Sequence, residues 1–207
     1  MIGSPTPFHP VQYDFILPCI FETNIFDLPV TFVSGGKLRI PRDNFAERFI
    51  TWGQFRLGDA IIWFFNTHLP HNHNEAASSR THAKIAKMFL EKRKELGAEN
   101  APTVVVGDMN SHASHFNKVD GGGFESNLQA NGFTWAYTAR GNPGHGSIDH
   151  ILYSTPHWTH SGCKDSGTGG SDHTSITCDL TLRVVVDVAM AQVAKHAEGE
   201  AYDEIDA

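Results

Sequence analysis

The sequence predicts an α/β fold built as a sandwich of two mixed sheets. Short apolar runs bounded by turn residues indicate several strands, whereas only one long stretch has clear helical spacing. Many strands with few helices favour this sandwich over a doubly wound sheet. The 207 residues suit one domain with a sizeable core, and the 40% hydrophobic and 19% charged content is that of a globular protein.

The N-terminal part of the chain contains two predicted strands after an irregular lead-in. Residues 1–14 are rich in proline and polar residues, which indicates the lead-in. The strands are Phe15–Phe21 and Val30–Val33, and the turn-forming pair Thr23–Asn24 lies between them.

The next two strands are predicted to form a hairpin. Arg48–Phe55 alternates between two sets of side chains, and Ala60–Phe65 is an apolar run. The connecting Leu57–Asp59 contains a central glycine, which is typical of a tight turn between antiparallel strands.

The clearest helix is predicted over Glu75–Leu96. Ile85 and Phe89 fall near helical spacing, and Gly97 stands just past the end, where glycine commonly terminates a helix. The remaining predicted elements are strands over Thr103–Val106, Phe133–Tyr137, Ile148–Tyr153 and Ser175–Val186, a weak helix over Phe124–Ala130, and a short helix over Asp187–Ala197. One domain over residues 15–186 and a C-terminal helix with an acidic tail over residues 187–207 follow from this division.

Charge and cysteine content restrict the possible partners. The formal net charge of −7 provides no general basic field that would attract long nucleic acids. Three scattered cysteines are too few for a disulfide framework or a thiolate zinc site, and free or buried thiols are the favoured interpretation. Cys163 and Cys178 are able to pair in an oxidising compartment.

The chain shows neither a membrane span nor a signal peptide. No apolar stretch reaches membrane-spanning length, and the first ten residues lack the basic and apolar regions of a signal peptide. The compartment stays open, as does the oligomeric state.

Four short motifs that carry chemically active side chains stand at strand ends or in predicted strands. They are Asn66–His68, Gly107–Asn110, Ser147–Leu152 and Ser171–His173. A sheet can bring such strand ends together at one edge, so two histidines, three aspartates and an asparagine are expected to converge.

Asp108 and Asn110 are the first candidate pair. In an extended backbone, residues two apart project to the same side, so a carboxylate and an amide would lie together. This pair suits a phosphodiester, because one group holds water or a metal and the other donates to a phosphate oxygen. The alternative is an ordinary turn, since all residue types in Gly107–Asn110 are common in turns.

His173 is the second candidate. The glycines that precede it leave room for a ligand to approach, and a catalytic histidine requires an orienting carboxylate. Asp149 is the expected partner because it lies in an otherwise apolar strand, where an unpaired carboxylate would be costly.

These motifs, in this order, resemble the endonuclease/exonuclease/phosphatase superfamily, whose fold is that of deoxyribonuclease I. The resemblance covers about Phe15 to Leu182 and implies a Mg²⁺- or Mn²⁺-dependent phosphoesterase, with phosphodiester hydrolysis by activated water. It implies a pairing of Asp149 with His173 and places Asp108 and Asp172 at the metal. The catalytic residues it implies are His68, Asp108, Asn110, Asp149 and His173.

The resemblance also implies how the phosphate is bound. His68 would contact the scissile phosphate and protonate the leaving oxygen, and Asn110 would donate to a phosphate oxygen. Arg80, at the start of the predicted helix, suits a phosphate contact and a structural ion pair equally well, whereas a structural role is favoured for Arg48.

One family feature has no counterpart in these 207 residues. The family carries its principal magnesium ligand, a glutamate, on an N-terminal strand, and neither Glu22 nor Glu47 stands in a matching context. The chain is therefore expected to be an N-terminally truncated member. A catalytically impaired remnant of the fold is the corresponding alternative function.

A zinc hydrolase is a further alternative, because His68, His71 and His73 are closely spaced. The spacing differs from that of the metallo-β-lactamase loop, however, and further ligands would be needed. The substrate stays open among nucleic acids, nucleotides and phospholipid headgroups, since family members that act on all of these share the motifs.

Overall fold

The structure is a computed structural model. It describes residues 30–43, 46–71, 75–111, 123–140 and 148–183. The predicted strand Phe15–Phe21 and the predicted helix Asp187–Ala197 lie outside these residues.

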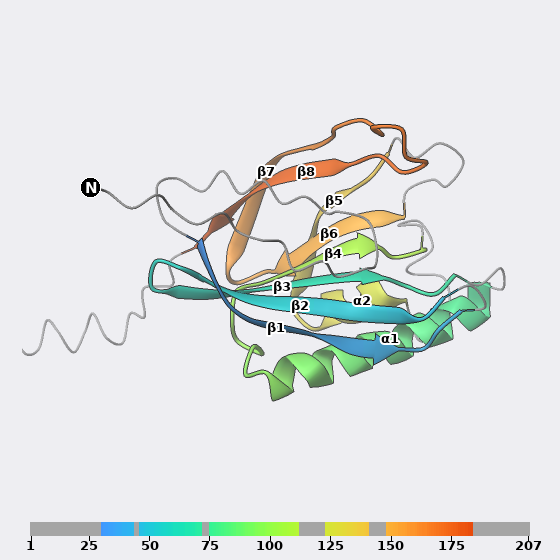
Figure 1. The fold of residues 1–207 in the computed structure, drawn as a ribbon, viewed down its shortest axis with the longest axis horizontal. Coiled ribbons are helices and arrows are strands. Elements are labelled where there is room, and N and C mark those ends of the chain that lie inside the picture. Colours follow the sequence, from blue (N-terminus) through green and yellow to red (C-terminus); the bar gives the residue numbers. More distant parts are fainter. Residues whose placement is uncertain (1–29, 44–45, 72–74, 112–122, 141–147, 184–207) are drawn as a thin grey trace, which may run out of the picture.

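Six strands form the main sheet (Figure 1). In spatial order they are β1 (Val30–Ile40), β2 (Arg48–Leu57), β3 (Ala60–His68), β4 (Thr103–Asp108), β6 (Asp149–Ser154) and β5 (Phe133–Thr138). Neighbouring strands are antiparallel except β3 and β4, which are parallel and are connected through a helix. The sheet is therefore mixed, and the predicted α/β class is confirmed.

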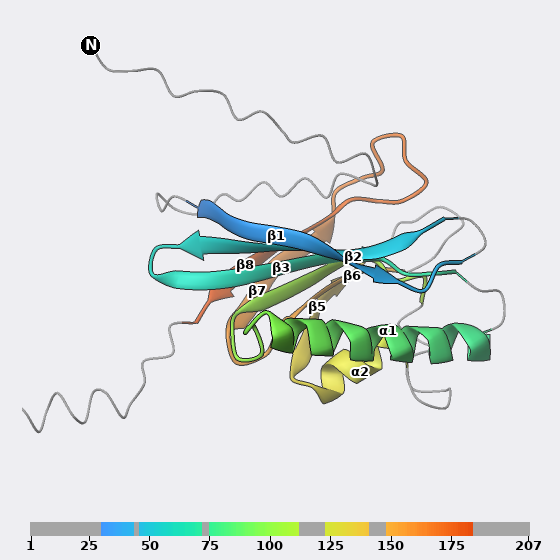
Figure 2. The ribbon, with the colours of Figure 1, turned by 60° about the horizontal axis from the view of Figure 1, so that its bottom comes forward.

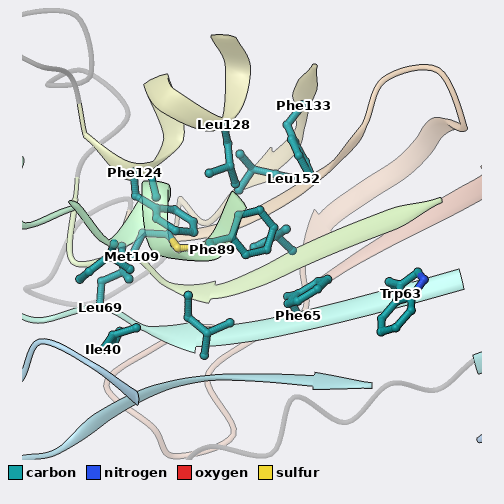
Figure 3. Close-up of a cluster of buried hydrophobic side chains, with 14 of the residues drawn as sticks. Ile40, Trp63, Phe65, Leu69, Phe89, Met109, Phe124, Leu128, Phe133 and Leu152 are labelled. Atoms are coloured by element: carbon teal, nitrogen blue, oxygen red, sulfur yellow. The ribbon is translucent and has the colours of Figure 1, made fainter. Parts of the chain in front are cut away.

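Both helices cover one face of this sheet. Figure 2 shows α1 (Glu75–Glu95) and α2 (Phe124–Ala130) together below the strands. Apolar side chains from the helices and from alternate strand positions fill the space between the helices and the sheet (Figure 3). Their burial removes apolar surface from water and so stabilises the fold. We call this the helix-side core; it includes Phe65, Phe89, Val105, Met109, Phe124 and Leu152.

A small second sheet covers part of the opposite face. It consists of β7 (Trp158–Asp165) and β8 (Ile176–Leu182), which pair antiparallel (Figure 1). Ile62, Val104 and Ile151 belong to the apolar cluster on this face, against which Ile176 and Leu180 of β8 pack. At the β1 edge, the side chains of Phe32 and Val33 are 56% and 44% exposed.

The sequence predictions agree with most elements, although several strands are longer than predicted. β1 continues to Ile40, and β3 reaches His68. β7 was not predicted, because its sequence contains few apolar residues. Six of its eight positions form the run Thr159–Lys164, which is polar except for a glycine and a cysteine. Its strand character depends on pairing with β8.

A disulfide joins Cys163 of β7 to Cys178 of β8. The favoured interpretation of free thiols was therefore wrong for this pair, and the alternative pairing is found. Sequence alone could not place these cysteines opposite each other, because the pairing depends on the unpredicted strand β7. Cys19 lies outside the described residues. None of the helices in the described part of the chain has both the length and the apolar character that crossing a membrane requires.

Candidate active site

Three candidate side chains form a row across the middle of the main sheet. His68 of β3 is in register with Asp108 of β4, and Asp108 is in register with Asp149 of β6. Alternation along each strand puts them on the face that β7 and β8 partly cover, since Val106 and Ile151 stand two residues away and belong to the cluster there. The sheet register thus brings residues from three distant motifs side by side.

The strand ends approach each other closely because of Gly107. Its φ is 141°, and a Cβ atom at this position would lie 1.8 Å from the backbone oxygen of Thr67. No side chain fits there, so glycine is required where β4 passes the end of β3. The next residue but one, Met109, inserts into the helix-side core together with Leu69 (Figure 3). These anchors leave Asp108 directed to the opposite face.

His173 joins the row from a loop. The loop follows β7, and Gly167, Gly169 and Gly170 in it have positive φ values. The backbone N–H of His173 donates to Oγ of Ser171 at 3.0 Å. The loop thereby carries His173 back over the sheet just before β8 begins.

The cluster is compact. Nδ1 of His173 lies 2.8 Å from Oδ2 of Asp149, and Nε2 of His173 lies 3.9 Å from Oδ2 of Asp108. Nε2 of His68 lies 3.3 Å from the same Asp108 oxygen. The hydrogen bond between His173 and Asp149 is the one expected from the sequence. It directs the other ring nitrogen of His173 toward Asp108.

Burial and neighbouring charges alter the protonation of these groups. Burial raises the pKa of Asp108 to about 6, although the N–H of Asn110 opposes the shift. Burial and then the Arg48 charge lower the pKa of His68 to about 4. Burial alone would lower the pKa of His173, but the hydrogen bond to Asp149 and the surrounding carboxylates raise it. At neutral pH the site therefore has an ionised Asp108 and a neutral His68.

Asn110 is near Asp108, but not for the predicted reason. Its φ is 45°, which is left-handed rather than extended, so the chain turns at Asn110, whereas Gly107 and Asp108 still belong to β4. The backbone N–H of Asn110 donates to Oδ1 of Asp108 at 2.8 Å. Its side-chain Nδ2 donates to the carbonyl of Leu69 at 2.7 Å. One hydrogen of the amide is thus used inside the protein.

Arg48 lies in a buried ion pair beside the row. Its Nε and Nη2 donate to Oδ2 of Asp43 at 3.0 and 2.7 Å, and the side chains are 10% and 2% exposed. The same Asp43 oxygen accepts the backbone N–H of His71 at 3.3 Å. The structural role favoured for Arg48 agrees with this geometry.

The structure does not bring three other candidates into the cluster. Asp172 is exposed and does not belong to the close group formed by Asp108, Asp149 and His173 among the described residues. Arg80 is exposed on α1, and His71 is exposed in the loop after β3. His73, the third member of the zinc alternative, lies outside the described residues, as does Glu22. Glu47 is exposed and forms an ion pair with Arg39.

Two buried histidines near the site were missed by the sequence analysis. His82 is 1% exposed and His150 is 0% exposed. A signal existed for each: His82 has helical spacing with Ile85 and Phe89, and His150 stands inside an apolar strand. Both patterns indicate burial, and a buried imidazole needs hydrogen-bond partners.

The donor set fits a hard divalent cation. Ligand atoms of Asp108, Asp149 and His173 all lie within 4.8 Å of one another. Magnesium is commonly bound by one or two carboxylates, with water and substrate phosphate completing the shell. Two aspartates in one cluster meet that requirement, and the imidazole of His173 adds a nitrogen donor.

Comparisons with known proteins identify the family of this chain and its fold. A model of the Endonuclease/Exonuclease/phosphatase family matches residues 4–173. Similar solved structures include the human Nocturnin catalytic domain with bound sulfate (17% identity, TM-score 0.52). They also include an endonuclease/exonuclease/phosphatase family protein from Bacteroides thetaiotaomicron (20%, 0.55) and D. rerio TDP2 complexed with a single-strand DNA product (18%, 0.53). At these identities the structural matches concern the fold alone.

The matches cover most of this chain but less of the other proteins. They cover 74%, 75% and 73% of this chain, and 60%, 66% and 68% of the Nocturnin, B. thetaiotaomicron and TDP2 chains respectively. The chain therefore spans three fifths to two thirds of these structures. No curated protein matches the sequence significantly.

Proposed function

Because the chain belongs to the endonuclease/exonuclease/phosphatase family, we propose that it is a metal-dependent phosphoesterase that hydrolyses phosphodiesters with activated water. The observation that carries the proposal is the convergence of Asp108, Asp149 and His173 within 4.8 Å. A buried carboxylate pair with an oriented histidine is costly to maintain in the absence of a function.

Asp108 is the proposed principal metal ligand, and Asp172 is proposed to join it when substrate and metal are bound. Magnesium or manganese at this position would neutralise charge that develops on the phosphate. Burial of Asp108, which is 6% exposed, strengthens its attraction for a cation because little water screens it.

His173 is the proposed proton carrier. Its Nδ1 is held by Asp149 at 2.8 Å, so its Nε2 is fixed in direction and is available to a reacting oxygen. In the part of the chain that the structure describes, no carboxylate orients the second ring nitrogen of His68, and burial lowers the pKa of His68 to about 4. We therefore assign His68 a phosphate contact as a neutral hydrogen-bond donor rather than the protonation of the leaving oxygen.

Asn110 and Arg80 are the proposed remaining phosphate contacts. The Asn110 amide has two hydrogens, and one donates to Leu69. The second would donate to a phosphate oxygen beside Asp108. Arg80 is exposed on α1 and would contact the outer part of a substrate.

The proposed substrates are small or single phosphodiesters. The solved TDP2 structure contains a single-strand DNA product, so this fold accommodates one strand of nucleic acid. A net charge of −7 opposes tight binding of long polyanions, which favours a short nucleic acid, a nucleotide or a phospholipid headgroup.

We also propose a specific fold type and a division of the chain into segments. Residues 15–186 would form a deoxyribonuclease I-like sandwich of two sheets, with a lead-in over 1–14 and a C-terminal helix and acidic tail over 187–207. Support comes from the two packed sheets and from partial structural matches with TM-scores above 0.5.

The experiment is hydrolysis of bis-p-nitrophenyl phosphate by the full 207-residue chain, with magnesium or manganese and with excess EDTA. We expect turnover that EDTA abolishes and manganese restores. A folded protein that shows no turnover with either metal would favour the alternative of a catalytically impaired remnant. Activity that depends on tightly bound zinc would favour the alternative based on His68, His71 and His73.

A further inference from the structure

Two buried histidines lie outside the candidate metal site and contact the two turns that follow β3 and β4. His82 belongs to α1 and His150 to β6, and their exposures are 1% and 0%. Neither is among the three residues grouped as possible metal ligands in the described part of the chain.

His82 holds the turn that follows β3. Its Nε2 lies 2.9 Å from the carbonyl oxygen of Pro70, two residues after His68. A carbonyl only accepts hydrogen bonds, so Nε2 of His82 carries the hydrogen. α1 thereby fixes the chain immediately after a candidate phosphate contact.

His150 holds the turn that follows β4. Its Nε2 lies 2.9 Å from the carbonyl oxygen of Ser111, the residue after Asn110. Its Nδ1 lies 2.9 Å from Oγ1 of Thr138 on the neighbouring strand β5. The Ser111 contact requires a hydrogen on Nε2, and the Thr138 hydroxyl is able to donate to or accept from Nδ1.

The two turns are bonded to each other between these histidines. The N–H of Leu69 donates to the carbonyl of Asp108 at 2.9 Å, and Nδ2 of Asn110 donates to the carbonyl of Leu69 at 2.7 Å. The φ of 45° at Asn110 is left-handed, a conformation that asparagine tolerates better than most other non-glycine residues. His82 and His150 hold the outer ends of this bonded pair.

We propose that His82 and His150 are positioning residues, which clamp the bonded turns so that Asp108 and Asn110 keep the geometry needed for metal and phosphate. The inference rests on the proposed function for its catalytic meaning. It is distinct from a general packing role, because each ring makes a directed bond to a turn carbonyl that an apolar side chain of similar size cannot replace.

The test uses variants that keep or remove the Nε2 donor. His150→Leu removes it, whereas His150→Gln places an amide nitrogen near the original Nε2. Thr138→Val is the matched control, since it removes only the contact on the other ring nitrogen. His82→Leu and His82→Gln form the equivalent pair on the other turn.

The first readout is amide hydrogen exchange, which requires no activity. The N–H groups of Leu69 and Asn110 report on the turns, and the N–H of Trp63, bonded to Pro102 at the other end of β3, reports on the sheet. We expect His150→Leu and His82→Leu to accelerate exchange at Leu69 and Asn110 by about 10-fold or more relative to Trp63. The Gln variants should restore exchange to within about threefold, and Thr138→Val should have the smaller effect.

The second readout is manganese affinity. Residues that orient metal ligands typically change it by about 10–100-fold, so the Leu variants should weaken binding by this factor and the Gln variants should recover it. Equal acceleration at Trp63, unchanged exchange at the turns, or Gln variants that behave like Leu would overturn the inference. If the turns respond as expected but the wild type neither binds manganese nor hydrolyses phosphodiesters, the proposed function fails while the clamp stands.

Discussion

The candidate site has two halves that are built differently. His68, Asp108 and Asp149 stand at the ends of three hydrogen-bonded strands, where sheet register fixes their spacing. His173 stands in a loop rich in left-handed glycines and reaches the row by contacts that include its bond to Asp149. The sheet half is thus fixed by the whole fold, whereas the loop half depends on local contacts.

This difference suggests separate chemical roles for the two halves of the site. Buried strand ends are suited to hold a cation, because preorganised ligands need little rearrangement when it binds. The loop histidine is suited to proton transfer, because the bond of its Nδ1 to Asp149 directs its Nε2 toward the metal site. The predictions below compare the two halves, in order of decreasing effect on hydrolysis.

Asp108→Asn should have the largest effect. It removes the negative charge from the centre of the sheet half, and the several kcal/mol that a metal contributes correspond to a loss on the order of 10³-fold in turnover. Calorimetric titration with manganese should show no tight binding, while circular dichroism shows a folded protein. Retained manganese affinity would mean that the sheet half does not hold the cation.

His173→Ala should have the next largest effect and a different signature. Loss of a proton carrier should reduce kcat on the order of 10²-fold, at the lower end of what general acid–base catalysis contributes. Manganese affinity should fall less than in Asp108→Asn.

Asp149→Asn should lower kcat similarly, and the double variant with His173→Ala should lower it little further, because the two residues act as a unit. Additive losses would show that the hydrogen bond between them is unimportant.

The same glycine substitution in each half provides a comparison of rigidity. Gly107→Ala forces a Cβ to within 1.8 Å of the Thr67 oxygen, so the strand ends must separate. We expect a loss of unfolding free energy of about 3 kcal/mol or more and a marked loss of turnover. At Gly169 the φ is 56°, but an added Cβ would have no atom within 4 Å. Gly169→Ala should therefore lower the free energy of unfolding by only about 1 kcal/mol. Urea denaturation measures both, and equal costs would contradict the proposed difference in rigidity.

Glu125→Gln should leave hydrolysis nearly unchanged and alter stability. Glu125 on α2 is fully buried, neither of its carboxylate oxygens has a hydrogen-bond partner among the described residues, and burial raises its pKa from 4.5 to about 8. Between these values the unfolded chain releases this proton and the native protein keeps it. Wild-type stability should therefore fall as pH rises from about 4.5 to about 8, by a few kcal/mol relative to Glu125→Gln. Parallel pH profiles of the two unfolding free energies would contradict the raised pKa.

Sequence reasoning predicted the strand ends of the sheet half and, in the loop half, the pairing of His173 with Asp149. Apolar runs and alternation identify strands, so strand ends such as His68 and Asp108 follow directly. Asn110 was placed near Asp108 for the wrong reason, because a left-handed turn leaves no periodic signal. The position of Asp172 depends on loop conformation, which no periodicity encodes.

The supporting residues were the least predictable. The ion pair between Asp43 and Arg48 and the bonds of His82 and His150 link segments that are brought together only by the completed fold. Polar residues in apolar patterns indicated burial but not their partners. The disulfide was the less favoured alternative for the same reason, since it depends on the pairing of β7 with β8.

The central claim, that the row of strand ends holds the catalytic cation, is tested most directly by anomalous scattering from crystals of the full chain grown with manganese. We predict a peak about 2.1–2.3 Å from a carboxylate oxygen of Asp108, on the side that faces Asp149 and His173. The peak should be absent in Asp108→Asn. A peak at His68 and His71 away from Asp108, or no peak in crystals of a protein whose hydrolysis depends on manganese, would contradict the account.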